Sequence, residues 1–391
     1  MSSPVPARSG IRFGPHLLVF SIGYVVFSFA AVPGAVIDRF DVGFTAVGLL
    51  MSAALTSFVL VQPLVGRVVD GRATLPILLA LGAVQALLAI VIDVPTQYWA
   101  VLMLRAVWGL AGGFALTVGA THLSRVYAGA GATRHEGIYG GVLTAGGGVA
   151  FLITPVVVNA TGWFGVHAVG GILAVPALLA LWWDRDFASD TISEARADTR
   201  AAEADPKPSS PLFDRVVLLS AGCYVATLGA YVTLSTFVTA YFDDLGVEVP
   251  LNALALFAAS LGRGSGGFAV TYPGVDDGRL IAATTGTAAA GLVALAFGEG
   301  IALLVLPLVV LGAVSLPFGA IFKTAAVATR RDATALAVVI AAGNVGALVL
   351  PVLTGRLRDV TGTYDAAFLM LATLNALAVV AGLAITRRIG E

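Results

Sequence analysis

Residues 75–92 read LPILLALGAVQALLAIVI, an uncharged stretch that lies between Arg72 and Asp93. A helix needs about 20 apolar residues to cross a hydrocarbon core of roughly 30 Å. Every backbone polar group inside lipid must be hydrogen-bonded within the protein, which favours helices over irregular chain. The stretch is therefore predicted to be a membrane-spanning helix.

The rest of the chain has the same character. Of its 391 residues, 58% are hydrophobic and 12% are charged, and the mean hydropathy is +0.93. A soluble domain carries about 25% charged residues, and a soluble chain this apolar would aggregate through its exposed surface. The single cysteine, Cys223, excludes an internal disulfide. The net charge of −1, without a long run of one sign, argues against a nucleic-acid partner.

Apolar runs between polar breaks predict an all-α membrane protein of twelve spans. The predicted spans are 16–37, 44–65, 75–92, 98–120, 137–158, 163–183, 213–238, 250–270, 280–297, 301–322, 335–355 and 365–386. Two boundaries rest on short breaks, at 159–162 and 298–300, because each merged run would be about twice the length of a span. The first run is longer than the apolar region of a signal peptide and lacks a cleavage site, so it is predicted to be a span.

The basic residues predict the orientation. With both termini in the cytoplasm, seventeen of the 22 lysines and arginines lie in inner segments. Arg39, Arg356 and Arg358 lie in outer loops, and Arg105 and Arg263 lie inside predicted spans. Both the N- and C-termini are therefore predicted to be cytoplasmic.

A polar stretch at 184–212 divides the predicted spans into two equal sets. Its charged residues and prolines are typical of a tether, either disordered or a short surface helix. The predicted organisation is an N-terminal six-helix bundle at 1–183, a cytoplasmic linker at 184–212 and a C-terminal six-helix bundle at 213–391. Two pseudo-symmetric bundles joined by a long inner loop are the layout of a transporter built from parallel repeats.

The loop between the second and third predicted spans reads PLVGRVVDGR, residues 63–72. Gly66 lets two helices approach closely, Asp70 is placed to act on the N-terminus of a neighbouring helix, and Arg72 can pair with it. An ordinary tight turn with a solvated ion pair is the alternative. The loop resembles the signature loop of the major facilitator superfamily, with a shorter spacing between Asp70 and Gly-Arg. The resemblance implies that Gly66, Asp70 and Arg72 form a conformational latch on the cytoplasmic side.

Three further segments carry the same resemblance. Arg105 and Gly109 match the superfamily's Arg-x-x-x-Gly, Asp277-Gly278-Arg279 echoes the signature loop, and residues 355–362 resemble a common end of the eleventh span. The resemblance covers nearly the whole chain. It implies a secondary or facilitative transporter that works by alternating access of two helical bundles.

Arg105 and Arg263 are the informative charges inside the predicted spans. An arginine at the centre of a bilayer costs about 2.5–3.5 kcal/mol on insertion scales. Guanidinium groups in a cavity bind anions in a bidentate geometry. Since no carboxylate falls at mid-membrane depth in the predicted spans, a positive cavity and a small anionic substrate are expected. In the alternatives, Arg105 has a structural or proton-relay role, and Arg263 lies nearer the cytoplasmic end and pairs with the loop.

The segment Arg263-Gly-Ser-Gly-Gly267 resembles the Arg-x-x-Gly-Gly of the nitrate/nitrite porter branch, where the arginine holds the anion. That branch has a second arginine in span two, where this chain offers only Gln62. Gln62 and Arg263 each lie four residues before a matched glycine, so the two are expected to face each other. The departure favours a broader anion class, such as nitrate, cyanate or small carboxylates.

Other predicted substrate contacts come from polar and aromatic residues in the spans, for which ordinary packing is the alternative. They are Asn344, Trp108, Tyr24 and Tyr231. Glycines in the spans are expected to let helices pack closely. They are Gly109, Gly146, Gly147, Gly148, Gly267, Gly343 and Gly346. The four histidines have no metal-ligand spacing, so no metal or other cofactor is predicted.

The leading hypothesis is thus an anion transporter of the plasma membrane, acting as a monomer. Its partners would be a small solute, the lipid bilayer and a coupled proton or counter-anion. A drug or metabolite efflux carrier of the same superfamily is the alternative. An integral-membrane enzyme would require an acid/base or metal cluster, and His135-Glu136 lacks partners in the sequence, so no enzyme is predicted.

Overall fold

The structure is a computed structural model that describes residues 9–69, 72–127, 130–185, 214–247, 251–272, 274–329 and 332–389. Every regular element in these ranges is a helix. The first set is α1 (Ser9–Phe27), the 3-10 helix η1 (Ser28–Ala31), α2 (Pro33–Phe40), α3 (Phe44–Val69), α4 (Thr74–Ile92), α5 (Tyr98–Val126), α6 (Ala130–Thr161) and α7 (Ala168–Trp183). The second set is α9 (Arg215–Asp244), α10 (Leu251–Ala269), α11 (Asp277–Phe297), α12 (Ala302–Ser315), α13 (Phe318–Ala328), α14 (Asp332–Thr361) and α15 (Asp365–Ile389).

Ten helical segments are long and apolar enough to cross a membrane. Two further helices lie at positions of predicted spans: α7, a shorter apolar helix of 16 residues, and α10, which carries Arg263. The all-helical, multi-span prediction is therefore confirmed, while the count of twelve spans and the orientation of the termini stay predictions.

Two predicted spans are broken. The first ends as α1 at Phe27, continues as η1 and restarts as α2 at Pro33. Proline has no N–H and cannot continue the hydrogen-bond ladder of a preceding helix, but it suits the first turn of a new one. The tenth predicted span breaks in the same way at Pro317, between α12 and α13.

Other boundaries also differ from prediction. Helix α6 begins at Ala130 rather than near 137, so His135 and Glu136 lie in a helix and not in a loop. The turn predicted at 298–300 occurs between α11 and α12, whereas the one predicted at 159–162 lies later, at 162–167, because α6 continues to Thr161.

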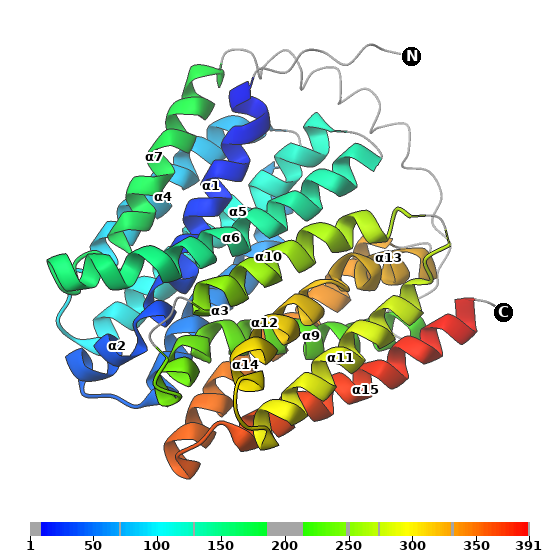
Figure 1. Cartoon of the computed structure of the whole chain (residues 1–391). Helices are drawn as coiled ribbons and strands as arrows, with labels where there is room; N and C mark the ends of the chain where they lie inside the picture. The colour runs from blue at the N-terminus through cyan, green and yellow to red at the C-terminus, as the bar shows by residue number, and fades with distance from the viewer. Residues whose placement is uncertain are drawn as a thin grey trace.

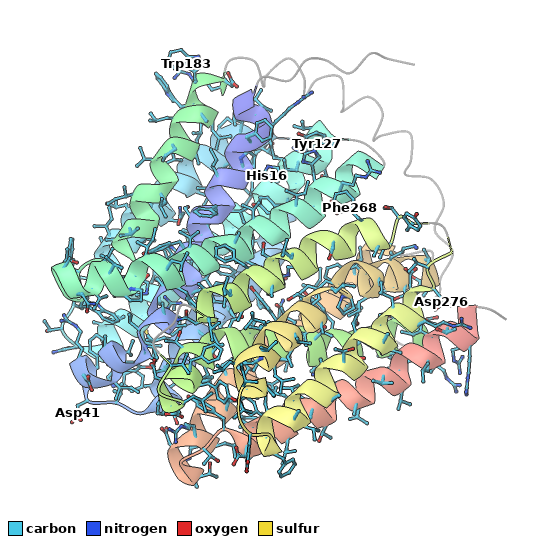
Figure 2. All side chains as sticks on the ribbon, viewed as in Figure 1. His16, Asp41, Tyr127, Trp183, Phe268 and Asp276 are labelled. Atoms are coloured by element: carbon cyan, nitrogen blue, oxygen red, sulfur yellow. The ribbon has the colours of Figure 1, made fainter. Side chains whose placement is uncertain are left out.

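The two chain ends define one end of the bundle. Gly10 donates its N–H to Asp184 at 2.8 Å, and the hydroxyl of Thr386 donates to Asp276 at 2.8 Å. In Figure 2, Trp183, Tyr127, Phe268 and Asp276 lie toward this end, and Asp41 lies at the opposite one. We call these the terminal end and the distal end.

Two long helix pairs join the first set of helices to the second: α3 with α14, and α6 with α10 (Figure 1). The α3–α14 pair meets in its distal half, where the Ser52 hydroxyl donates to the Leu348 carbonyl at 2.6 Å. The α6–α10 pair meets toward the terminal end, where the Ser260 hydroxyl donates to the Gly141 carbonyl at 2.7 Å. Most other packing is internal to each set, as two bundles would require; the boundary at 184–212 lies almost wholly outside the described residues and stays a prediction.

Close helix approach explains several of the predicted packing glycines. A Cβ on Gly146 would meet the Phe20 carbonyl of α1, and one on Gly109 would lie 2.5 Å from the Ala54 carbonyl of α3. A Cβ at 148 would lie 3.0 Å from the Phe257 ring of α10. Backbones at this distance leave no room for a side chain.

Candidate functional site

The Arg263 side chain, on α10, packs against two aromatic rings. Its guanidinium carbon lies 4.8 Å from the centre of the Tyr231 ring of α9 and 4.4 Å from that of the Phe318 ring of α13. Its Nε is buried without a hydrogen-bond partner, and none of the described residues accepts a hydrogen bond from its side chain. The alternative in which Arg263 pairs with the following loop therefore finds no contact in the described part of the chain.

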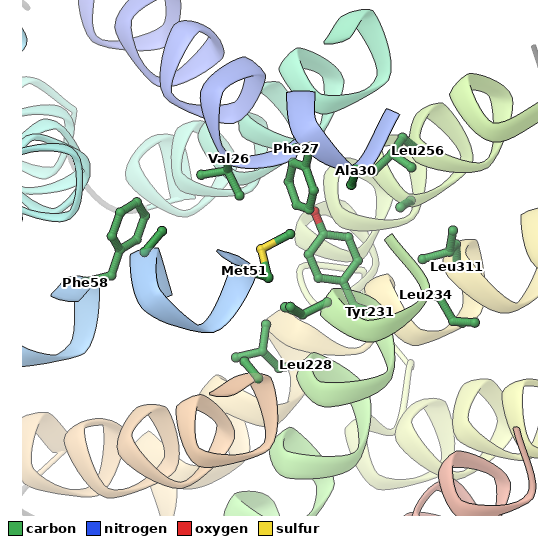
Figure 3. Close-up of a cluster of buried hydrophobic side chains, with 14 of the residues drawn as sticks. Val26, Phe27, Ala30, Met51, Phe58, Leu228, Tyr231, Leu234, Leu256 and Leu311 are labelled. Atoms are coloured by element: carbon green, nitrogen blue, oxygen red, sulfur yellow. The ribbon is translucent and has the colours of Figure 1, made fainter. Parts of the chain in front are cut away.

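The Arg263 site lies where the two sets of helices meet. The Tyr231 hydroxyl lies 3.1 Å from the Thr144 hydroxyl of α6, and the Tyr231 ring makes an edge contact with Phe27 of α1 at 6.1 Å. Figure 3 shows Tyr231 surrounded by Phe27, Met51, Leu228 and Leu234. A Cβ at Gly140 would lie 3.6 Å from the Arg263 Cδ, so the glycine-rich face of α6 leaves space beside this arginine.

Arg105 lies elsewhere, inside the first set of helices, and is fully buried. It donates hydrogen bonds to the carbonyls of Leu50, Val25 and Val26 at 2.9, 3.3 and 3.2 Å. A further bond of 2.7 Å joins it to His167 Nε2. Since its N–H groups are directed at these partners, the geometry favours a positioning role over contact with a solute.

The expectation that no buried carboxylate accompanies the arginines is wrong for Arg105. Asp93, at the end of α4, is only 3% exposed and accepts a bond from His167 Nδ1 at 2.7 Å. Asp93 accepts the backbone N–H groups of His167 and Ala168 at the start of α7, so position along a hydropathy profile is a poor guide to burial. The cluster carries one acid and one base rather than a net positive charge.

Trp108 and Tyr24 also point into the first set of helices. Trp108 is fully buried and donates its indole N–H to Gln85 at 3.3 Å. The Tyr24 hydroxyl lies 2.9 Å from the Thr154 hydroxyl. These contacts agree with the packing alternative for both residues.

Gln62 and Asn344 make no hydrogen bond with Arg263 in the described part of the chain. Gln62 lies on α3, which packs against α5 and α14, whereas Arg263 lies on α10 beside α6. The structure therefore does not bring Gln62 to Arg263. Asn344 lies on α14, which packs against α9, and its Nδ2 is buried without a partner. A Cβ added to the neighbouring Gly343 would meet the Tyr224 ring of α9.

A cavity of about 460 Å³ opens at the distal end between η1, α2, α6, α9 and α10. Its polar lining comes from Asn159, Thr239, Asp243 and Asn252. Asp243 is the one charged residue among the described residues that line it. Three of the helices that line it, α6, α9 and α10, also carry residues of the Arg263 site, but none of the Arg263 site residues lines the cavity.

Comparison with families of known proteins matches residues 16–329 to the Major Facilitator Superfamily. The chain belongs to this superfamily. It is therefore a multi-pass membrane protein and a membrane transporter. The match describes the superfamily as a whole and does not single out the nitrate/nitrite branch. None of the curated proteins compared with the chain matches it.

The superfamily's signature loop is described in part. Gly66 lies in α3, while Asp70 lies outside the described residues. Arg72 donates to the Val68 carbonyl at 3.3 Å, and Arg125 of α5 donates to the Arg72 carbonyl at 2.9 Å. The predicted pairing of Asp70 with Arg72 stays a prediction, and Arg125 is a contact that the motif did not identify.

In the second set of helices, the structure describes the Asp277-Gly278-Arg279 segment that resembles this loop. Asp276 caps α11 by accepting the Arg279 N–H at 2.8 Å, and Asp277 pairs with Lys323 of α13 at 2.9 Å. Burial acts to raise the pKa of Asp276, but the bonds from Arg279 and Thr386 outweigh it and lower that pKa below its ordinary value of 3.8. This end of α11 is thus tied to both α13 and α15.

Proposed function

We propose that this superfamily member is a secondary or facilitative transporter for a small anionic solute, working by alternating access. The observation that carries the proposal is the Arg263 guanidinium, held between the Tyr231 and Phe318 rings with no hydrogen-bond acceptor among the described residues. The substrate class is nitrate, cyanate or a small carboxylate.

The energetics support this assignment. A guanidinium deep in a membrane protein is costly, and such residues usually pair or face a water-filled cavity. The ring faces stabilise the cation by cation–π attraction but cannot accept its N–H hydrogen bonds. A planar or forked anion accepts two of them side by side.

The other residues predicted to contact the solute are assigned different roles in this proposal. Asn344 has a buried amide nitrogen without a partner and is proposed as a second donor. Tyr231 positions Arg263 through its ring. Arg105, Trp108 and Tyr24 are proposed to shape the first bundle rather than to bind the solute, and Gln62 has no described contact that supports a role.

Uptake or exchange in proteoliposomes tests the proposal. Nitrate, cyanate, formate and acetate would be compared with a cationic dye, using the parent protein and Arg263→Ala. Arg387→Ala is the matched control, because it removes the same charge from an exposed position at the end of α15. We expect one or more anions to cross in the parent and in Arg387→Ala but not in Arg263→Ala. Equal anion flux in all three proteins would overturn the proposal.

An efflux carrier for a larger organic molecule is the second candidate. The distal cavity favours it, because its volume of about 460 Å³ exceeds what a small anion needs and its one charged lining residue among those described is acidic. Movement of the dye without movement of any anion, abolished in Asp243→Asn, would favour this function.

The setting proposed for the carrier is the plasma membrane, with both termini in the cytoplasm and the chain acting as a monomer. Tests of coupling would compare an imposed proton gradient with an imposed counter-anion gradient.

A further inference from the structure

Three side chains form a buried, hydrogen-bonded chain in the first set of helices: Asp93 at the end of α4, His167 at the start of α7 and Arg105 within α5. The Asp93 carboxylate accepts the backbone N–H groups of His167 and Ala168 at 2.8 and 2.9 Å and bonds His167 Nδ1 at 2.7 Å. On its other side, His167 Nε2 lies 2.7 Å from Arg105. Asp93, His167 and Arg105 are 3%, 0% and 0% exposed.

The neighbours of His167 fix its protonation. An arginine side chain can only donate hydrogen bonds, so the imidazole nitrogen facing Arg105 must accept. The Asp93 carboxylate accepts, so the nitrogen facing it must carry the hydrogen. This assignment is the same whichever way the ring is turned. The structure therefore holds a neutral His167 between a carboxylate and a guanidinium.

Arg105 connects His167 to the break between α1 and α2 through hydrogen bonds to the end of α1. The last carbonyls of a helix lack partners within it, and the carbonyls of Val25 and Val26, at the end of α1, accept hydrogen bonds from Arg105. Its guanidinium also lies 4.3 Å from the centre of the Phe29 ring in η1. The segment that follows, Ala31 to Ala35, lines the distal cavity.

We propose that Asp93, His167 and Arg105 form a proton-binding site that controls the break between α1 and α2. One proton from the distal side binds Nε2 of His167, no covalent bond breaks, and the cluster changes from neutral to a charge of +1. Two N–H donors then face each other where a hydrogen bond stood. Arg105 moves away from His167, and its hydrogen bonds to the Val25 and Val26 carbonyls at the end of α1 weaken.

The surroundings leave this proton few competing sites. The Tyr24 hydroxyl of α1 bonds Thr154, and the Tyr98 hydroxyl of α5 bonds the Ala46 carbonyl at 2.9 Å. Arg39 of α2 donates to the Pro95 carbonyl and lies over the Trp163 ring, not on the cluster. The proton has a short route from the distal surface to the cluster, because Val94, next to Asp93, is 62% exposed at that end.

Through Arg105, the site ties a histidine and a carboxylate to the end of α1, ahead of the segment that lines the distal cavity. It is separate from Arg263, which lies on α10 among residues of α9 and α13. Proton binding here goes beyond the proposed anion transport and does not depend on it.

Fluorescence of Trp163 tests the proposal without a substrate. The Trp163 ring makes an edge contact with His167 at 6.0 Å, and an imidazolium quenches indole emission more strongly than a neutral imidazole does. The emission of Trp163 is obtained as the difference between the purified parent and Trp163→Phe. We expect it to fall with a single inflection below pH 6.5 as the solution is acidified from about pH 8 to 4, because burial lowers the pKa of His167 and outweighs the raising effect of Asp93.

In His167→Gln the inflection should be lost, and in Asp93→Asn it should move to lower pH, because the imidazolium loses its counter-charge. A parent protein whose Trp163 emission shows no inflection over this range would overturn the proposal, and this outcome needs no variant of the cluster to fold. An inflection that persists unchanged in His167→Gln would overturn it as well. The result of the anion-flux experiment on Arg263 is independent of this fluorescence result.

Discussion

The carboxylate of Asp359, near the end of α14, caps the N-terminus of α3 at Thr45. It accepts the N–H groups of Phe44 and Thr45 at 2.8 and 2.9 Å and also the Thr45 hydroxyl hydrogen bond. A negative charge at a helix N-terminus is stabilising, and here the charge comes from the other set of helices. The contact therefore holds α3 and α14 together at the distal end.

Replacing Asp359 with Ala should loosen this distal contact. Loss of a capping side chain costs about 1–2 kcal/mol, which corresponds to an about 5- to 30-fold rise in the population of open states. The probe is Ser52→Cys in a Cys223→Ser background, because Ser52 is buried against Leu348 of α14. We expect a membrane-impermeant thiol reagent to label it faster by about that factor.

The matched control for Asp359 is Asp38→Ala, which removes an exposed acid at the same end. It should leave the labelling rate unchanged. Equal rates for Asp359→Ala and the parent would show that the cap does not hold the two helices together.

Arg105→Ala should reduce the amount of folded protein and not only its flux. Removing the guanidinium leaves the buried carbonyls of Leu50, Val25 and Val26 without a donor, and each unsatisfied buried group costs about 1–3 kcal/mol. The thermal midpoint in detergent should fall strongly, whereas Arg387→Ala should leave it near that of the parent. A stable Arg105→Ala protein that has lost only transport would instead favour direct contact with the solute.

Gly146→Val should also destabilise the fold, because the added side chain meets the Phe20 carbonyl of α1. Overpacking of a tight interior costs about 1–3 kcal/mol. Gly222→Ala is the control, since a Cβ there meets nothing within 4 Å. Size-exclusion profiles after stepwise heating should separate the two variants, and similar profiles would argue against close packing of α1 on α6.

Asp276→Asn should lower thermal stability at neutral pH by removing the charged cap of α11. Since the folded pKa of Asp276 lies below its ordinary value of 3.8, its stabilising effect is present above that value and is lost as the pH falls through the folded value. The difference in thermal midpoint between parent and variant should therefore be constant near pH 7 and shrink below about pH 4. A difference that grows on acidification would contradict this.

Hydropathy predicted where most spans lie because about 20 apolar residues are needed to cross a bilayer. It could not predict the break before Pro33, because that proline sits inside a continuous apolar run, 16–37, and hydropathy does not register a lost backbone donor. The start of α6 at Ala130 was missed for the converse reason: a helix continues through polar residues such as Arg134 once it leaves the apolar region.

The site could be predicted only in part. Arg263 was identifiable because a charge in an apolar run is costly. Its aromatic partners, Tyr231 and Phe318, lie on other helices and are brought to it by packing alone. Asp93 and His167 lie at span ends 74 residues apart. A search for an acid and a histidine at neighbouring span ends on the same side of the membrane is the signal that could have found them.

Binding of an anion to Arg263 is the central claim, and equilibrium binding to purified protein tests it most directly. The anion that crosses proteoliposomes would be titrated by calorimetry into the parent, Arg263→Lys, Arg263→Ala and Arg387→Ala. Hydrogen bonds to charged groups contribute about 1.5–3 kcal/mol, so Arg263→Ala should bind about 10- to 150-fold more weakly. Arg263→Lys should fall between, because it keeps the charge and loses the planar fork, and Arg387→Ala should match the parent. An Arg263→Ala protein that binds the anion as tightly as the parent would contradict the account.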